Sequence, residues 1–142
     1  MAQDGPRRIM VVDDDPDILS IAQIALEAMG GFTIETCSSG QEAVNRVTVF
    51  QPDLILLDAT MPGMTGPETL AALTAQQRAD TPPVVFFTGR VRSDDLAMFD
   101  QLGAVGVVEK PFDPTSLAGT VRDIWARKCA WVTVADDWNK GN

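Results

Sequence analysis

Short apolar runs alternate with segments of helical periodicity along this chain. Four of the runs lie at residues 9–12, 54–57, 84–87 and 105–108. They are rich in Val, Ile, Leu and Phe and are flanked by Gly, Pro or Asp, a pattern that predicts strands buried on both faces. Because helical segments separate the runs, we expect parallel strands joined by right-handed crossovers.

One further strand and five helices complete the predicted pattern. Residues 32–36 alternate apolar and polar side chains, which is typical of a half-exposed strand at the edge of a sheet. Helices are expected at residues 16–29, 41–50, 67–78, 93–103 and from 113 onward. The sequence therefore predicts an α/β fold built from five βα units.

Each buried run ends near a polar side chain that could handle a phosphoryl group. Asp13 and Asp14 follow the first run, and Asp58 follows the second. Thr88 follows the third, and Lys110 comes shortly after the last. Since the carboxyl ends of parallel strands share one edge of the sheet, we expect three carboxylates, a hydroxyl and an ammonium to meet there.

Each of these residues also has an ordinary structural explanation. The first two aspartates could begin a helix, Asp58 and Thr88 could lie in turns, and Lys110 could be a solvated surface residue. Taken singly, that explanation is the stronger one in every case. Taken together, it requires four independent coincidences at the same end of four strands, so we favour a common site.

The chemistry of such a cluster points to a cation and a phosphoryl group. Three adjacent carboxylates repel one another, and one would take up a proton unless a cation neutralised the cluster. Oxygen ligands of this kind suit Mg²⁺, with water and a phosphoryl group completing the coordination. An aspartate can attack phosphorus to form an aspartyl phosphate, while a lysine and a hydroxyl hold the remaining phosphoryl oxygens.

The composition of the chain excludes several classes of function. The chain has 142 residues, which suits one domain with a proper core. Its 20 acidic and 11 basic residues give a net charge of −9, which argues against binding to nucleic acid or to an anionic membrane. There is no histidine, so oxygen ligands and a lysine must carry the chemistry. Without a signal peptide, a bilayer span or a disulfide framework, the expected location is cytoplasmic.

These positions together resemble the receiver domain of the two-component response regulators. The resemblance runs from about residue 8 to residue 127. It rests on Val-Asp-Asp at 12–14, Asp58 with Met-Pro-Gly at 61–63, Thr-Gly at 88–89 and Lys-Pro-Phe at 110–112. It implies a flavodoxin-like (βα)5 fold with a doubly wound parallel sheet of strand order 2-1-3-4-5. It also implies a phosphoacceptor switch rather than an enzyme.

The resemblance implies a role for each acidic residue of the cluster. Asp58 would accept the phosphoryl group and would also ligate Mg²⁺. The Asp14 carboxylate and the backbone carbonyl of Thr60 would be further ligands, and Asp13 would act largely through metal-bound water. Asp15 matches no ligand position and is interpreted as an acid in the first helical turn.

The resemblance also covers the phosphoryl-binding residues, with one departure. Thr88 and Lys110 would bind phosphoryl oxygens, and the Lys110–Pro111 peptide is expected to be cis. Regulators of this family often carry Tyr or Phe where this chain has Val107, and that ring turns inward on activation. A purely aromatic switch cannot operate at Val107.

The expected domain plan is a receiver domain at residues 1–128 and a short tail at 129–142, with no output domain. We expect the tail to pack onto the body or fray in solvent. The alternative is a partner or dimer contact made by Trp131 and Trp138.

The functional hypothesis is a single-domain response regulator. A histidine kinase or a histidine phosphotransfer protein would phosphorylate Asp58, and the chain would then signal by contact with a downstream protein effector. One alternative is an intermediate in a phosphorelay. Another is a Mg²⁺-dependent phosphohydrolase with an Asp nucleophile, although Thr60 stands where such enzymes carry a second acid. A flavodoxin-like cofactor binder is disfavoured, because three aspartates would repel a cofactor phosphate.

Overall fold

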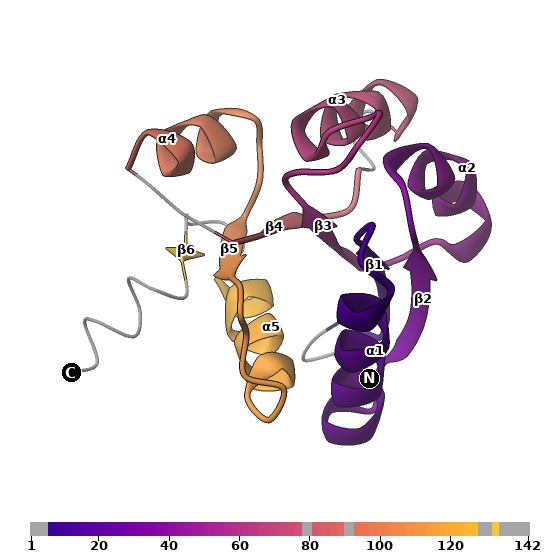
Figure 1. The fold of residues 1–142 in the computed structure, drawn as a ribbon, viewed down its shortest axis with the longest axis vertical. Helices are drawn as coiled ribbons and strands as arrows, with labels where there is room; N and C mark the ends of the chain where they lie inside the picture. Colours follow the sequence, from indigo (N-terminus) through magenta and orange to yellow (C-terminus); the bar gives the residue numbers. More distant parts are fainter. Residues whose placement is uncertain (1–5, 78–80, 90–92, 128–131, 134–142) are drawn as a thin grey trace.

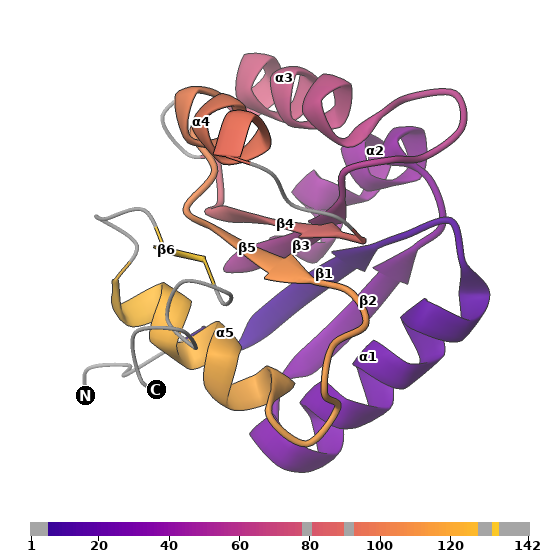
Figure 2. The ribbon, with the colours of Figure 1, turned by 60° about the vertical axis from the view of Figure 1, so that its left-hand side comes forward.

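A parallel sheet with helices on both faces forms the body of the protein (Figures 1 and 2). The computed structural model describes residues 6–77, 81–89, 93–127 and 132–133. The strands are β1 (Arg8–Val12), β2 (Thr33–Cys37), β3 (Leu54–Asp58), β4 (Val84–Thr88), β5 (Gly106–Glu109) and β6 (Val132–Thr133). The helices are α1 (Pro16–Gly30), α2 (Gly40–Phe50), α3 (Gly66–Gln77), α4 (Ser93–Gln101) and α5 (Leu117–Ala126). The strands follow the order β2-β1-β3-β4-β5-β6, which confirms the predicted 2-1-3-4-5 arrangement with β2 at an edge.

The alternation of side chains along each strand divides the core into two halves. In β3, Ile55 and Leu57 pack with residues of α2, α3 and α4, whereas Leu54 and Leu56 pack with residues of α1 and α5. Figure 1 shows the same division, with α1 and α5 on one side of the sheet and the other three helices opposite. Because helices cover both faces, the central strands must be apolar at every position, which explains the continuous runs in the sequence.

Polar caps set where several helices begin. The Asp15 side chain accepts a hydrogen bond from the Asp17 N–H at the start of α1, and Ser39 does the same for the Glu42 N–H at the start of α2. Thr65 and Glu68 form a reciprocal capping box before α3, with N–O distances of 3.2 and 2.9 Å. In the described part of the chain, no helix is long and apolar enough to span a bilayer.

The last helix begins later than the sequence predicts. Asp113 Oδ1 accepts hydrogen bonds from the Thr115 N–H at 2.9 Å and the Thr115 hydroxyl at 2.7 Å. The Ser116 N–H donates to the Asp113 carbonyl, which closes a turn. An aspartate that binds the backbone two residues on favours a turn over a helix, so the prediction of a helix from residue 113 is wrong.

A short sixth strand extends the sheet beyond β5. Val132 pairs with Gly106 and Thr133 pairs with Val107, both in parallel register. The sequence predicts no strand here, because two residues carry no periodicity that could signal one. Part of the tail therefore joins the sheet, while Trp131 and Trp138 lie outside the described residues.

Candidate functional site

The strand ends bring the predicted side chains to one edge of the sheet. Asp13 follows β1, Asp58 ends β3, Thr88 ends β4 and Lys110 follows β5. Together with neighbouring residues they line an open cavity of about 560 Å³. The residues that line it are Asp13, Asp14, Asp15, Asp58, Thr60, Thr88, Gly89 and Lys110.

Three carboxylates in this cavity lie close enough to share one ion. Oxygens of Asp13, Asp14 and Asp58 all lie within 4.8 Å of one another. The side chains of Asp13 and Asp58 are buried, with residue exposures of 0% and 4%, whereas Asp14 is exposed. The cluster thus has two buried carboxylates and one exposed carboxylate at the rim.

Lys110 lies between the two buried carboxylates. Its Nζ is 2.6 Å from Asp13 Oδ2 and 3.5 Å from Asp58 Oδ1. Burial disfavours the charged ammonium, but the two carboxylates outweigh this effect and raise the pKa of Lys110. The Lys110–Pro111 peptide is cis, as expected.

Burial dominates the ionisation of Asp58. It raises the pKa of Asp58 from 3.8 to about 6, against a hydrogen bond from the Thr60 backbone N–H, which lowers it. The pKa of about 6 already includes the negative charge of Asp13, which raises it, and the Lys110 ammonium, which lowers it. The N–H of Thr60 lies 3.2 Å from Asp58 Oδ1, so the same bond also orients the carboxylate.

Asp13 and Asp15 form the link between β1 and α1. Asp13 Oδ1 accepts a hydrogen bond from the Asp15 N–H at 2.9 Å, which fixes the orientation of the Asp13 carboxylate. The prediction that Asp15 lies in the first turn of the helix is off by one residue, because Asp15 is the N-cap that precedes α1. Its side chain is therefore committed to the Asp17 N–H at 2.9 Å.

The donor set fits a hard divalent cation. Asp13 Oδ2 accepts no hydrogen bond from the described residues and depends on its ion pair with Lys110. One ammonium faces three carboxylates, so the cavity keeps an excess of negative charge. Carboxylate oxygens at this spacing, open on one side to water, are the ligands that Mg²⁺ takes in phosphoryl-transfer sites.

Of the residues carried over from the resemblance, Thr60 and Thr88 line the cavity at different depths, and Val107 lies outside it. Thr60 is exposed at the rim, and Thr88 is buried at the end of β4. Val107 lies away from the cavity lining, paired with Phe86 in the ladder and buried at 1% exposure. A short aliphatic side chain therefore occupies the place where the family often carries a ring.

Phe87, which lies beneath Lys110, and its neighbour Phe112 were not predicted as site residues. The Phe87 ring lies 5.2 Å from Lys110 Nζ and 5.1 Å from the Phe112 ring. A cation within about 6 Å of a ring centroid is attracted to the π face. The strand parity of β4, which turns Phe87 away from Phe86, is the signal that could have identified this contact.

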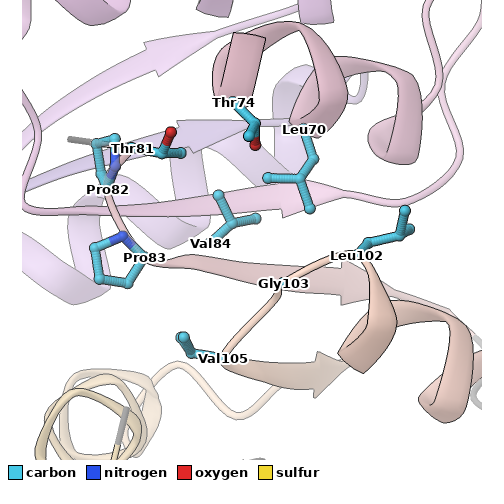
Figure 3. Close-up of a pocket in the computed structure, with 9 residues that line it drawn as sticks. All are labelled: Leu70, Thr74, Thr81, Pro82, Pro83, Val84, Leu102, Gly103 and Val105. Atoms are coloured by element: carbon cyan, nitrogen blue, oxygen red, sulfur yellow. The ribbon is translucent and has the colours of Figure 1, made fainter. Parts of the chain in front are cut away.

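A second cavity lies near the opposite edge of the sheet (Figure 3). Its volume is about 340 Å³, and it lies between the end of α3, the start of β4 and the end of α4. Figure 3 shows Leu70 and Thr74 of α3 facing Val84 and Leu102. Its described lining carries no charged side chain, so the ionic chemistry belongs to the acidic cavity.

The family model described as the response regulator receiver domain matches residues 9–122 of this chain. The response regulator Rre1 of Synechocystis is 33% identical over 125 residues, which cover 88% of this chain and 54% of that protein. The DNA-binding response regulator MtrA of Mycolicibacterium smegmatis is 35% identical over 116 residues, covering 82% and 49%. The chain thus spans about half the length of these two relatives.

A solved structure shows the same architecture. The chemotaxis response regulator CheY4 of Vibrio cholerae superposes with a TM-score of 0.77 at 28% identity, covering 83% of this chain and 98% of that one. The family model, the fold and the acidic cavity all point to the same family. This chain belongs to the response regulator receiver domain family of two-component signalling, whose members are phosphoacceptor switches rather than conventional enzymes.

Proposed function

We propose that this chain is a switch in which Asp58 accepts a phosphoryl group from a phosphohistidine of a histidine kinase or a histidine phosphotransfer protein. One observation carries the proposal: the Asp58 carboxylate, only 4% exposed, lies beside Asp13 and 3.5 Å from Lys110 in an open cavity. A carboxylate so placed is oriented by its surroundings and has room for a donor above it.

The proposed reaction is a displacement at phosphorus. An oxygen of Asp58 forms the new O–P bond, the P–N bond of the donor breaks, and its electron pair stays with the departing imidazole nitrogen. The N–H of Thr60 holds Asp58 Oδ1 during this step. Lys110 and Thr88 line the same cavity and are proposed to bind the phosphoryl oxygens, on which negative charge is spread.

The proposed metal ligands are the carboxylates of Asp13, Asp14 and Asp58 and the backbone carbonyl of Thr60. When bound, Mg²⁺ would offset the charge of both the carboxylates and the transferring group. Asp14 and Asp58 are proposed as direct ligands, and Asp13 is proposed to act through metal-bound water. Before a metal binds, the ion pair between Lys110 and Asp13 holds the buried Asp13 carboxylate in position.

Signalling is proposed to leave the chain through contact with a downstream protein. The new phosphoryl charge lies against Thr88 and Lys110, which end β4 and follow β5, so both strand ends feel it. The hydrolase alternative is not proposed, because Thr60 stands two residues after Asp58, where the sequence of such an enzyme carries a second acid.

Intact-mass measurement after incubation with acetyl phosphate and Mg²⁺ tests the proposal. We expect one phosphate on the parent chain, labile in base, and none on Asp58→Asn. The matched control is Asp15→Asn, which removes one charge from the same cavity while keeping a capping side chain, and it should be labelled. Equal labelling of Asp58→Asn would refute the assignment.

A further inference from the structure

Gly66, the first residue of α3, lies against the backbone of the residue proposed to be phosphorylated. A Cβ atom added at Gly66 would lie 2.5 Å from the Asp58 carbonyl oxygen, 2.7 Å from Ala59 Cα and 3.0 Å from the Phe86 ring. Contacts this short to backbone atoms cannot be relieved by a side-chain rotation. Only a residue without a side chain allows α3 to begin here.

The start of α3 is also tied to the same stretch of backbone. The Gly66 N–H donates to the Ala59 carbonyl at 3.1 Å. One residue earlier, Thr65 takes part in the capping box with Glu68, and the Thr69 hydroxyl donates to the Thr65 carbonyl at 2.7 Å. The first turn of α3 is therefore well braced and cannot retreat without losing these bonds.

This contact lies behind the atoms on which the site depends. The Asp58 carboxylate points into the cavity from the residue whose carbonyl touches Gly66. Thr60, two residues on, donates to Asp58 Oδ1 and carries the carbonyl proposed as a metal ligand. A shift of the 58–60 backbone would thus displace a ligand, the nucleophile and the bond that orients it.

We propose that Gly66 is a positioning residue, which sets the location of the Asp58–Thr60 backbone by letting α3 start in direct contact with it. The proposal rests on the proposed function of Asp58. It predicts that a methyl group at position 66 damages the site more than it damages the fold, since the two closest atoms belong to the backbone of Asp58 and Ala59.

The test compares Gly66→Ala with Gly119→Ala. Gly119 lies in α5, where an added Cβ meets nothing within 4 Å, so the same chemical change occurs without crowding. By calorimetric titration with Mg²⁺, we expect the dissociation constant of Gly66→Ala to rise about 10-fold, the scale of losses when support of a metal ligand is removed. Gly119→Ala should match the parent. Amide shifts of Ala59 and Thr60 in the metal-free protein should move only in Gly66→Ala.

A third variant separates positioning from loss of helix stability. Thr65→Ala removes the capping hydroxyl but adds no atom near Asp58, so it should lower the melting temperature and leave Mg²⁺ affinity unchanged. If Gly66→Ala does not fold, the same change is made in the Gly119→Ala background, which stabilises an exposed helix. Failure to fold there would overturn the proposal, because the glycine would then serve the fold as a whole.

The outcomes for the two proposals are distinct. A parent chain that binds no Mg²⁺ and takes no phosphate would refute the proposed function itself. A parent that binds Mg²⁺ while Gly66→Ala binds it equally well, with unmoved Ala59 and Thr60 shifts, would overturn only the role of Gly66.

Discussion

The burial of the Asp58 carboxylate lowers the stability of the folded protein. This carboxylate is buried next to Asp13, and its pKa is raised to about 6 because burial disfavours the ionised form. The Lys110 ammonium relieves part of this cost through its contacts with both carboxylates. The fold thus gives up stability at Asp58, the residue proposed to act as nucleophile and metal ligand.

The pKa of Asp58 predicts how stability depends on pH. Since the folded-state pKa of about 6 exceeds the ordinary value of 3.8, the folded chain holds this proton more tightly than the unfolded chain. The resulting stability is fully present below 3.8 and is lost as the pH rises through about 6.

Asp58→Asn should therefore stabilise the metal-free protein at neutral pH, by on the order of 3 kcal/mol for a shift of this size. The gain should vanish in acid. Urea unfolding at several pH values, in the presence of a chelator, measures it. Asp15→Asn is the matched control and should show no comparable gain, whereas a constant difference at every pH would contradict the explanation.

At the scale of elements, short-range hydrogen bonds decide where helices begin. Asp15 caps α1, Ser39 caps α2 and the Thr65–Glu68 box caps α3. The turn at Asp113 shows the opposite effect, because its side chain binds the Thr115 N–H and delays α5 to Leu117. The same residue type can thus begin a helix or postpone one.

The cap at Asp15 gives a prediction about α1. Asp15→Ala removes the acceptor for the Asp17 N–H and should lower the free energy of unfolding by about 1 kcal/mol. Asp15→Asn keeps an acceptor and should be close to the parent. Urea denaturation of the parent and the two variants measures the free energy of unfolding. Equal losses in both variants would mean that the charge of Asp15, not its capping hydrogen bond, stabilises α1.

The sixth strand gives a prediction about the edge of the sheet. Removing residues 128–142 takes away the partner of Gly106 and Val107, so backbone amides of β5 should exchange hydrogen faster. Removing only residues 134–142 leaves Val132 and Thr133 and is the control. Hydrogen exchange read by mass spectrometry compares them, and identical rates in both truncated chains would show that β6 does not protect β5.

At the scale of the whole molecule, the site is connected to α4 through aromatic packing. Phe86 of β4 stacks on Phe99 of α4, with ring centroids 4.4 Å apart and an angle of 27° between the planes. Phe86 is also the ladder partner of Val107 and comes two residues before Thr88. In place of a ring at Val107, this stack links the end of β4 to the helix above it.

Phosphorylation should therefore change the β4–α4–β5 region most. Amide shifts on adding beryllofluoride with Mg²⁺ should be largest between Thr88 and Lys110, as a loop and helix adjustment of modest size. Phe99→Leu should reduce the changes in α4 while those at Asp58 persist. If the largest changes fall within residues 32–50, the route through Thr88 is wrong.

Mg²⁺ should also stabilise the molecule as a whole. A ligand that binds only the folded state raises its stability by mass action, and here it also relieves repulsion among three carboxylates. The melting temperature should rise with Mg²⁺ concentration in the parent and stay nearly flat in Asp14→Ala. A flat response in the parent would argue against a preorganised acidic cluster.

Much of this molecule could be predicted from local patterns. The continuous run at residues 54–57 indicated a strand buried on both faces, and the alternation at 32–36 indicated an edge strand, as β3 and β2 confirm. The two-residue strand β6 carried no pattern, and the start of α5 depended on a side-chain hydrogen bond that a list of apolar positions does not register.

Which residues lie at the carboxyl edge follows from the sequence alone, because a strand buried on both faces must be apolar up to its end, and the first polar residue marks that end. How these residues interact depends on the packing of the folded chain. The burial that raises the pKa of Asp58, the 2.6 Å contact of Lys110 with Asp13 and the approach of Gly66 to Asp58 all depend on packing between separate elements. Such contacts bring together residues that are far apart in the sequence, and no periodicity along the chain encodes them.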